Sequence, residues 1–123
     1  MNKADLRIIC TSFSNGKRHD FRLFAESGTH MRAETQALTD TGYLGIEKLH
    51  ANSVQPRKSS KLHKLTREDK LYNHSVSSDR IANEHVIGSL KRFKIISDKY
   101  RNRRKRFGLR FNLICGIHNF ELD

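Results

Sequence analysis

The chain has 123 residues, of which 36% are hydrophobic and 30% charged, and its formal net charge is +11. This length allows one domain at most, and so strong a positive charge favours nucleic acid as the partner. Cys10 and Cys115 lie far apart and no apolar leader opens the chain, which argues against a secreted disulfide framework. The apolar stretches are too short to span a bilayer. We therefore expect a soluble intracellular protein that does not use a membrane.

Residues 1–50 predict the order strand, helix, strand. Leu6–Phe13 is rich in Ile, Thr and Phe and precedes an Asn15–Gly16 turn, so we expect a strand there. Asp20–Glu26 predicts a short helix, and Gln36–Thr39 predicts a short strand that ends at Asp40. A carboxylate at the end of a strand, beside a glycine-containing turn, is typical of sites in α/β proteins.

Residues 51–76 read as a long polar connection, with a short helix near Thr66–Leu71. We expect His50, His63 and His74 to be solvated, because their spacing does not suit zinc and no cysteine lies nearby. Ser77 or Ser78 is expected to cap the next helix, which should run to about Ser97. A last helix should cover roughly Arg104–Phe120 and be largely buried.

The helix expected after Ser77 has a polar stripe and a separate apolar face. At about 100° per residue, Glu84 lies about 40° and Lys91 about 20° around the helix from Arg80. This stripe suits a metal ligand between two phosphate-binding groups, although the stripe by itself favours the alternative of an exposed helix face with ion pairs. The apolar face consists of Ala82, Val86, Leu90 and Phe93.

Basic residues are concentrated near the C-terminus, with Asp98 as the single acid among them. Such a block repels itself unless phosphates neutralise it, so we expect it to contact nucleic acid, the alternative being a solvated charged face. Its members are Lys91, Arg92, Lys94, Lys99, Arg101, Arg103, Arg104, Lys105, Arg106 and Arg110.

Two-metal phosphodiester chemistry needs carboxylates that converge on a pair of divalent cations. Asp40 and Glu84 are the best candidates, and no convincing third carboxylate precedes Asp40. The alternative for Asp40 is a turn-forming aspartate before Thr41–Gly42.

Three stretches, Asn15–Phe21, Thr39–Gly45 and Arg80–Lys91, together resemble the DDE transposases of bacterial insertion sequences. The family's second acid lies in an Asp-x-Gly-Tyr segment, matched by Asp40, Gly42 and Tyr43. Its third acid lies in an Arg-x3-Glu-x6-Lys helix, matched by Arg80, Glu84 and Lys91. Some members carry a tyrosine three residues before the arginine, where this chain has Ser77, so the role of that tyrosine is not carried over.

The resemblance implies an α/β fold of the ribonuclease H-like type, with long C-terminal helices. The chain would begin at the family's third strand, so we expect an incomplete fold without the first two strands and without the first catalytic aspartate. Residues 1–123 would then form a partial catalytic domain: strand, helix, strand over 1–50, the polar connection over 51–76, and the catalytic-glutamate and basic helices over 77–123. Asp40 and Glu84 would bind Mg²⁺ or Mn²⁺, with Lys91 and Arg80 at phosphates.

The function that follows is that of a truncated transposase. Its intact relative would cleave and transfer DNA strands with divalent metal, and the missing aspartate predicts loss of cleavage. The alternatives are an inactive basic nucleic-acid-binding remnant, an inhibitor of full-length transposase, or one part of a split enzyme completed by an upstream-encoded fragment. In each case the partner would be DNA and the location the bacterial cytoplasm, at the nucleoid when DNA is bound.

Overall fold

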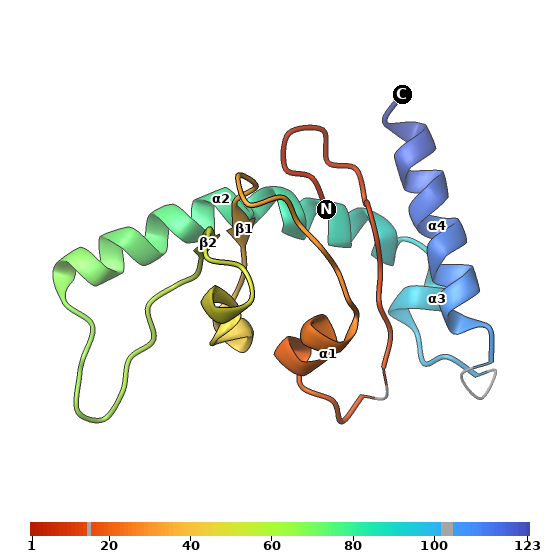
Figure 1. Ribbon diagram of the computed structural model, residues 1–123. Helices are drawn as coiled ribbons and strands as arrows, with labels where there is room; N and C mark the ends of the chain where they lie inside the picture. The colour runs from red at the N-terminus through yellow and green to blue at the C-terminus, as the bar shows by residue number, and fades with distance from the viewer. Residues whose placement is uncertain (15, 102–104) are drawn as a thin grey trace. The chain divides into compact units, whose positions relative to one another are not determined.

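The computed structural model describes residues 1–14, 16–101 and 105–123. The chain divides into two compact units. Figure 1 labels the helices and strands. The terminal unit comprises Met1–Phe13 and Ile81–Asp123, and the central unit comprises Ser14–Arg80. Helix α2 (Arg67–Lys91) contributes residues to both units. No helix in the described part of the chain is both long and apolar enough to cross a membrane.

The central unit is built around a small parallel sheet. Ala37 pairs with Ser53 and Leu38 with Val54, and the amide of Thr39 continues the ladder by donating to the carbonyl of Val54 at 3.0 Å. The sheet, with the helices around it, agrees with the α/β class at the coarse level. The remaining elements of this unit, before α2, are the helix α1 and two 3-10 turns; the bounds are α1 Asp20–Glu26, β1 Ala37–Leu38, η1 Thr41–Tyr43, η2 Ile46–Lys48 and β2 Ser53–Val54.

The predictions for the first part of this unit are confirmed, since α1 has the predicted bounds and β1 lies within Gln36–Thr39. Strand β2 was missed, because it lies in the stretch interpreted as a polar connection. Ile46 is 1% exposed and forms the best-buried point of the unit. His50 is also buried, and its Nε2 lies 2.6 Å from the carbonyl oxygen of Thr35, so the expectation of solvated histidines is wrong for His50.

Helix α2 is longer than predicted and begins with a reciprocal cap. The amide of Thr66 donates to Asp69 at 2.9 Å, and the amide of Asp69 donates to the Thr66 hydroxyl at 3.1 Å. Two backbone donors at the helix start are thereby satisfied. The helix then continues without a break through Val76, which is buried.

Two helix boundaries were therefore predicted wrongly. Ser77 and Ser78 lie inside α2, exposed, and do not cap a helix. Because the Thr66–Asp69 cap starts the helix earlier and no proline or glycine lies between Leu71 and Ser77, the two predicted helices are one. The helix ends at Lys91 rather than Ser97, and a separate short helix, α3 (Lys94–Ser97), follows after Phe93.

The terminal unit packs α3 and the last helix, α4 (Phe107–Glu121), against the end of α2. The core consists of Leu90, Ile114 and Cys115, with partly buried apolar side chains around them. Val86 and Leu90 of the predicted apolar face are buried, and Ala82 and Phe93 are partly buried, so this face is confirmed.

Helix α4 differs from its prediction in extent and burial. It begins at Phe107, after Arg106 with a φ of 57°, whereas the predicted start, Arg104, lies outside the described residues. The helix is not largely buried, because Leu109 and Leu113 are 68% and 66% exposed. Apolar residues occur all around this helix, but only the side that carries Ile114, Cys115 and His118 reaches the core.

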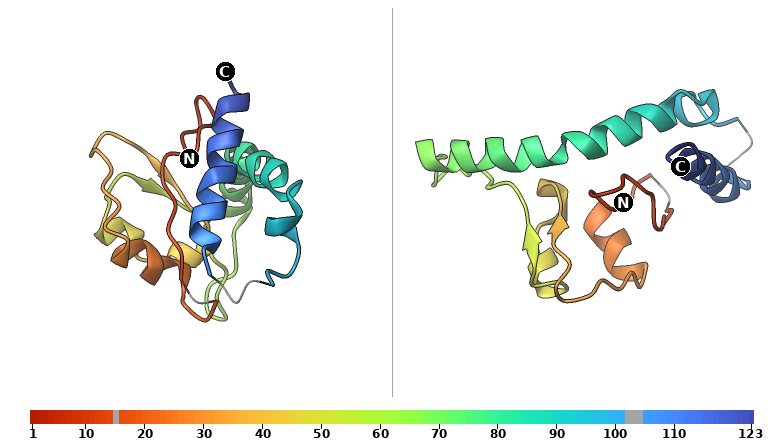
Figure 2. Two further views of the ribbon diagram at one scale, coloured as in Figure 1. Left: turned by 90° about the vertical axis from the view of Figure 1, so that its right-hand side faces the viewer. Right: turned by 90° about the horizontal axis from the view of Figure 1, so that it is seen from above.

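The segment Leu6–Phe13 is not a strand, contrary to prediction, and all its residues are described. The segment runs as an extended trace beside α4 (Figure 2), and a side chain of that helix holds its backbone. The amide of Ile8 donates to Asn119 Oδ1 at 2.8 Å, and Asn119 Nδ2 donates to the Ile8 carbonyl at 2.9 Å. A strand needs a partner strand for its backbone groups, and here a side-chain amide fills that role. The predicted turn residue Asn15 lies outside the described residues.

Candidate functional site

Asp40 follows β1 and uses its two carboxylate oxygens differently. Oδ1 accepts a hydrogen bond from the amide of Gly42 at 2.8 Å and thereby caps η1. Oδ2 lies 3.8 Å from Nη2 of Arg80, in the part of α2 that belongs to the central unit. The turn-forming interpretation of Asp40 is therefore correct, but the turn uses only one oxygen. The structure also brings Asp40 together with the first residue of the Arg-x3-Glu-x6-Lys motif.

A second carboxylate, which sequence reasoning passed over, lies beside Asp40. A Cβ atom added at Gly42 would lie 3.0 Å from Oδ1 of Asp40 and 3.7 Å from Oδ2 of Asp20. Asp20 begins α1, and contacts between α1 and η1 bring it to this turn. Gly42 is the one feature of the sequence that could have indicated this arrangement, because a residue without a side chain lets both carboxylates approach the backbone closely.

The pKa of Tyr43 is affected by the negative charges of Asp20 and Asp40. Burial raises the pKa of its phenol above the ordinary value, and the charges of Asp20 and then Asp40 raise it further. Its ring packs edge-on against Phe24 of α1, with 6.2 Å between the centroids. Tyr43 is thus a neutral hydroxyl near two carboxylates. In the described part of the chain, no group of three or more His, Cys, Asp or Glu side chains is arranged to hold a metal ion.

Glu84 and Lys91 lie on α2, as Arg80 does, so the predicted helix for this motif is confirmed. Both residues are exposed and belong to the terminal unit, whereas Arg80 and Asp40 belong to the central unit. Glu84 follows Arg80 by about one helical turn along α2.

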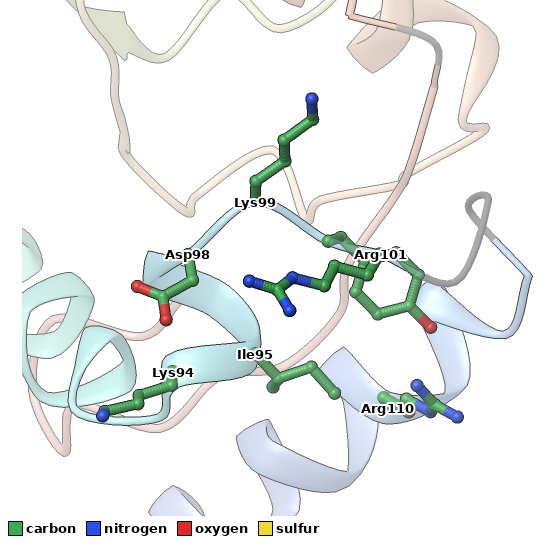
Figure 3. Close-up of a pocket in the computed structure, with 7 residues that line it drawn as sticks. Lys94, Ile95, Asp98, Lys99, Arg101 and Arg110 are labelled. Atoms are coloured by element: carbon green, nitrogen blue, oxygen red, sulfur yellow. The ribbon is translucent and has the colours of Figure 1, made fainter.

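Most of the predicted nucleic-acid-binding residues are exposed. They are Lys91, Arg92, Lys94, Arg101, Lys105 and Arg106. Arg92 also forms an ion pair with Glu121 and lies over the ring of Phe93, so it has a structural contact of its own. Arg103 and Arg104 lie outside the described residues. Arg101 and Lys94 line an open pocket of about 480 Å³ within the terminal unit (Figure 3).

Residues 3–119 match the family described as DDE superfamily endonuclease, and the chain belongs to this family. The resemblance to the DDE transposases of insertion sequences is thereby confirmed. The chain is also 48% identical, over 116 residues, to the "Probable transposase for insertion sequence element IS702" of Microchaete diplosiphon. The match covers 94% of this chain and 42% of that protein, so the chain spans less than half the length of this relative. No solved structure matches the chain significantly.

Proposed function

We propose that these 123 residues form part of the catalytic domain of a DDE transposase, which cleaves and transfers DNA strands with the help of divalent cations. The family match, which runs through both motifs from residue 3 to residue 119, is the observation that carries this proposal. The similarity to a transposase of an insertion sequence agrees with it. In the ribonuclease H-like fold that the family implies, the parallel strands β1 and β2 would belong to the larger catalytic sheet.

Asp40 and Glu84 are the proposed ligands of Mg²⁺ or Mn²⁺. Hard cations prefer carboxylate oxygens, and Oδ2 of Asp40 is not used by the turn that Oδ1 caps. Bound cations would stabilise the attacking and leaving oxygens of the phosphodiester. The Arg80 guanidinium orients the Asp40 carboxylate, and the exposed ammonium of Lys91 provides a point charge for a DNA phosphate.

A second function is favoured by the charge of the chain. The net charge of +11 and the exposed basic residues suit a protein that binds nucleic acid without cutting it. Such a protein would act as an inactive DNA-binding remnant or would inhibit a full-length transposase by joining it. Under either function we place the protein in the bacterial cytoplasm, at the nucleoid when DNA is bound.

Titration of Mn²⁺ or Mg²⁺ into the folded chain by isothermal calorimetry tests the two functions against each other. We expect weak binding that Asp40→Asn and Glu84→Gln each reduce. Glu68→Gln is the matched control, because Glu68 is an exposed acid of the same helix outside the motif. Binding that is absent from the folded chain, or that Glu68→Gln lowers equally, would favour the DNA-binding remnant.

Strand cleavage tests the expected loss of activity. Two ligands alone should hold cations weakly and in poor geometry, so the 123-residue chain by itself should not nick supercoiled DNA. Addition of a separate polypeptide, equivalent to the part of the transposase relative that this chain does not match, should allow nicking if that part supplies a further metal ligand. Magnesium-dependent nicking by the chain alone, abolished by Glu84→Gln, would contradict this expectation.

A further inference from the structure

The pocket of the terminal unit has a basic rim. Its volume is about 480 Å³, within the range of small-ligand sites in proteins. It lies between α3, the residues that follow α3, and the first turns of α4 (Figure 3). The lining residues are Lys94, Ile95, Asp98, Lys99, Tyr100, Arg101 and Arg110.

The charges of this lining favour an anion. Four of the seven residues are basic and one, Asp98, is acidic. In Figure 3 the Arg101 side chain extends toward Asp98 above Ile95, whereas Lys99 points away from the other labelled side chains. Arg110 lies on the opposite side of Ile95 from Lys94. An arginine guanidinium suits a phosphate group because its donors match two phosphate oxygens at once.

Ile95 and Tyr100 give the pocket an apolar part, and the aromatic ring of Tyr100 is held in place. The Tyr100 hydroxyl donates to the carbonyl of Lys105 at 2.6 Å, and its ring forms a T-shaped pair with Phe107, with 5.1 Å between the centroids. The Arg110 guanidinium carbon lies 5.7 Å from the Tyr100 ring centroid. Aromatic rings beside basic side chains are the usual means by which proteins hold single-stranded nucleic acid, one base at a time.

We propose that this pocket binds one unpaired nucleotide of DNA, with Arg101 and Arg110 on its phosphate and its base against Ile95 and Tyr100. A base within a duplex is covered by its neighbours and its pairing partner, so it cannot lie against Ile95 and Tyr100 inside the pocket. A phosphate alone would need the basic rim but neither these two side chains nor a cavity of this volume. The choice of DNA rests on the proposed function.

Binding is measured by fluorescence anisotropy, in EDTA, with a labelled single-stranded oligodeoxynucleotide and with the matching duplex. We expect the single strand to bind more tightly than the duplex. Tyr100→Leu removes the aromatic face and should weaken single-strand binding by about fivefold or more, with little effect on the duplex. Tyr100→Phe keeps the ring and should bind as the unmodified chain does.

The contribution of Arg101 to binding is tested by comparing it with a variant outside the pocket that loses the same charge. Arg101→Gln should weaken binding of the single strand by more than Lys105→Gln, because Lys105 is exposed in the same basic stretch but does not line the pocket. Equal losses from the two variants, or equal affinity for duplex and single strand, would overturn the proposal and leave a nonspecific basic surface.

Tyrosine fluorescence provides a measurement that does not depend on the stability of a Tyr100 variant. The chain has three tyrosines and no tryptophan. In the variant Tyr43→Phe/Tyr72→Phe, Tyr100 is the remaining tyrosine, and the single strand should quench its emission. Lack of quenching at saturating DNA would overturn the proposal. EDTA removes divalent cations, so the quenching measurement is independent of the metal titration. If the chain fails to bind metal but still binds the single strand, the proposed metal site is refuted and the pocket is supported.

Discussion

The two oxygens of the Asp40 carboxylate have different neighbours, and this determines what each substitution should do. Oδ1 caps the turn at Gly42, and Oδ2 faces Arg80. Asparagine keeps an oxygen that can accept the hydrogen bond from Gly42, but it removes the negative charge that faces Arg80. Alanine removes the acceptor and the charge. The structural role and the proposed role in metal binding are thus separable at one residue.

We expect Asp40→Ala to lower the free energy of unfolding by about 1 kcal/mol, the usual cost of a lost cap. Asp40→Asn should change it much less, because its side-chain oxygen still accepts from the amide of Gly42. Urea denaturation of the three proteins measures the difference. If asparagine proves as destabilising as alanine, the contact with Arg80 rather than the turn stabilises this corner.

At the scale of the element, helix α2 depends on the cap at its first turn. Asp69 accepts hydrogen bonds from the guanidinium of Arg57 and from the amide of Thr66. The Arg57 guanidinium, and then the Thr66 hydrogen bonds, hold the pKa of Asp69 at about 2, below its ordinary value of 3.8. Asn73 joins the same corner, since its side chain exchanges two hydrogen bonds with the backbone of Arg57.

The lowered pKa predicts a pH dependence of stability with a definite sign. The unfolded chain takes up the proton of Asp69 near pH 3.8 and the folded chain only near pH 2. The contribution of Asp69 is therefore present above pH 3.8 and is lost as the pH falls from there to about 2. In Asp69→Asn, the stability of the fold should therefore fall less between pH 3.8 and pH 2, as measured by circular dichroism at stepwise pH. If stability falls equally in Asp69→Asn and in the unmodified chain, Asp69 does not have the lowered pKa.

Helix α4 offers a matched pair of adjacent apolar residues. Ile114 is 6% exposed in the core of the terminal unit, and Leu113 is 66% exposed. Ile114→Ala should lower the free energy of unfolding by about 2–5 kcal/mol, because it leaves a cavity among packed side chains. Leu113→Ala should cost less than about 1 kcal/mol, as is usual at the surface. If thermal denaturation shows that both variants lose the same stability, the side of α4 that carries Leu113 is packed against other residues rather than exposed.

At the scale of the whole molecule, the net charge of +11 governs the encounter with DNA. Each phosphate contact releases counterions, so the logarithm of the affinity should fall linearly with the logarithm of the salt concentration. Lys91→Gln should reduce the magnitude of this slope by about 1. Arg57→Gln carries the same change of charge and should not alter the slope, because Asp69 already holds the Arg57 guanidinium. Equal effects of the two variants would indicate binding by net charge alone.

Local features of the fold could be predicted from the sequence. The bounds of α1, the position of β1 and the buried residues Val86 and Leu90 follow from patterns of neighbouring residues. The order of the Asp40 and Glu84 motifs was sufficient to recognise the family. Such patterns are readable because hydrophobic periodicity and turn residues act within a few positions along the chain.

Features that depend on a distant partner were decided only by the tertiary structure. Ser53–Val54 is a strand because β1 pairs with it, whereas Leu6–Phe13, without a partner strand, is held by Asn119. The approach of Asp20 to Asp40 depends in the same way on how α1 meets η1. The sequence by itself thus determined the family and the candidate acids, since these rest on residue identity and order. Packing decided strand pairing, burial and the neighbours of Asp40, because those interactions join residues far apart in the chain.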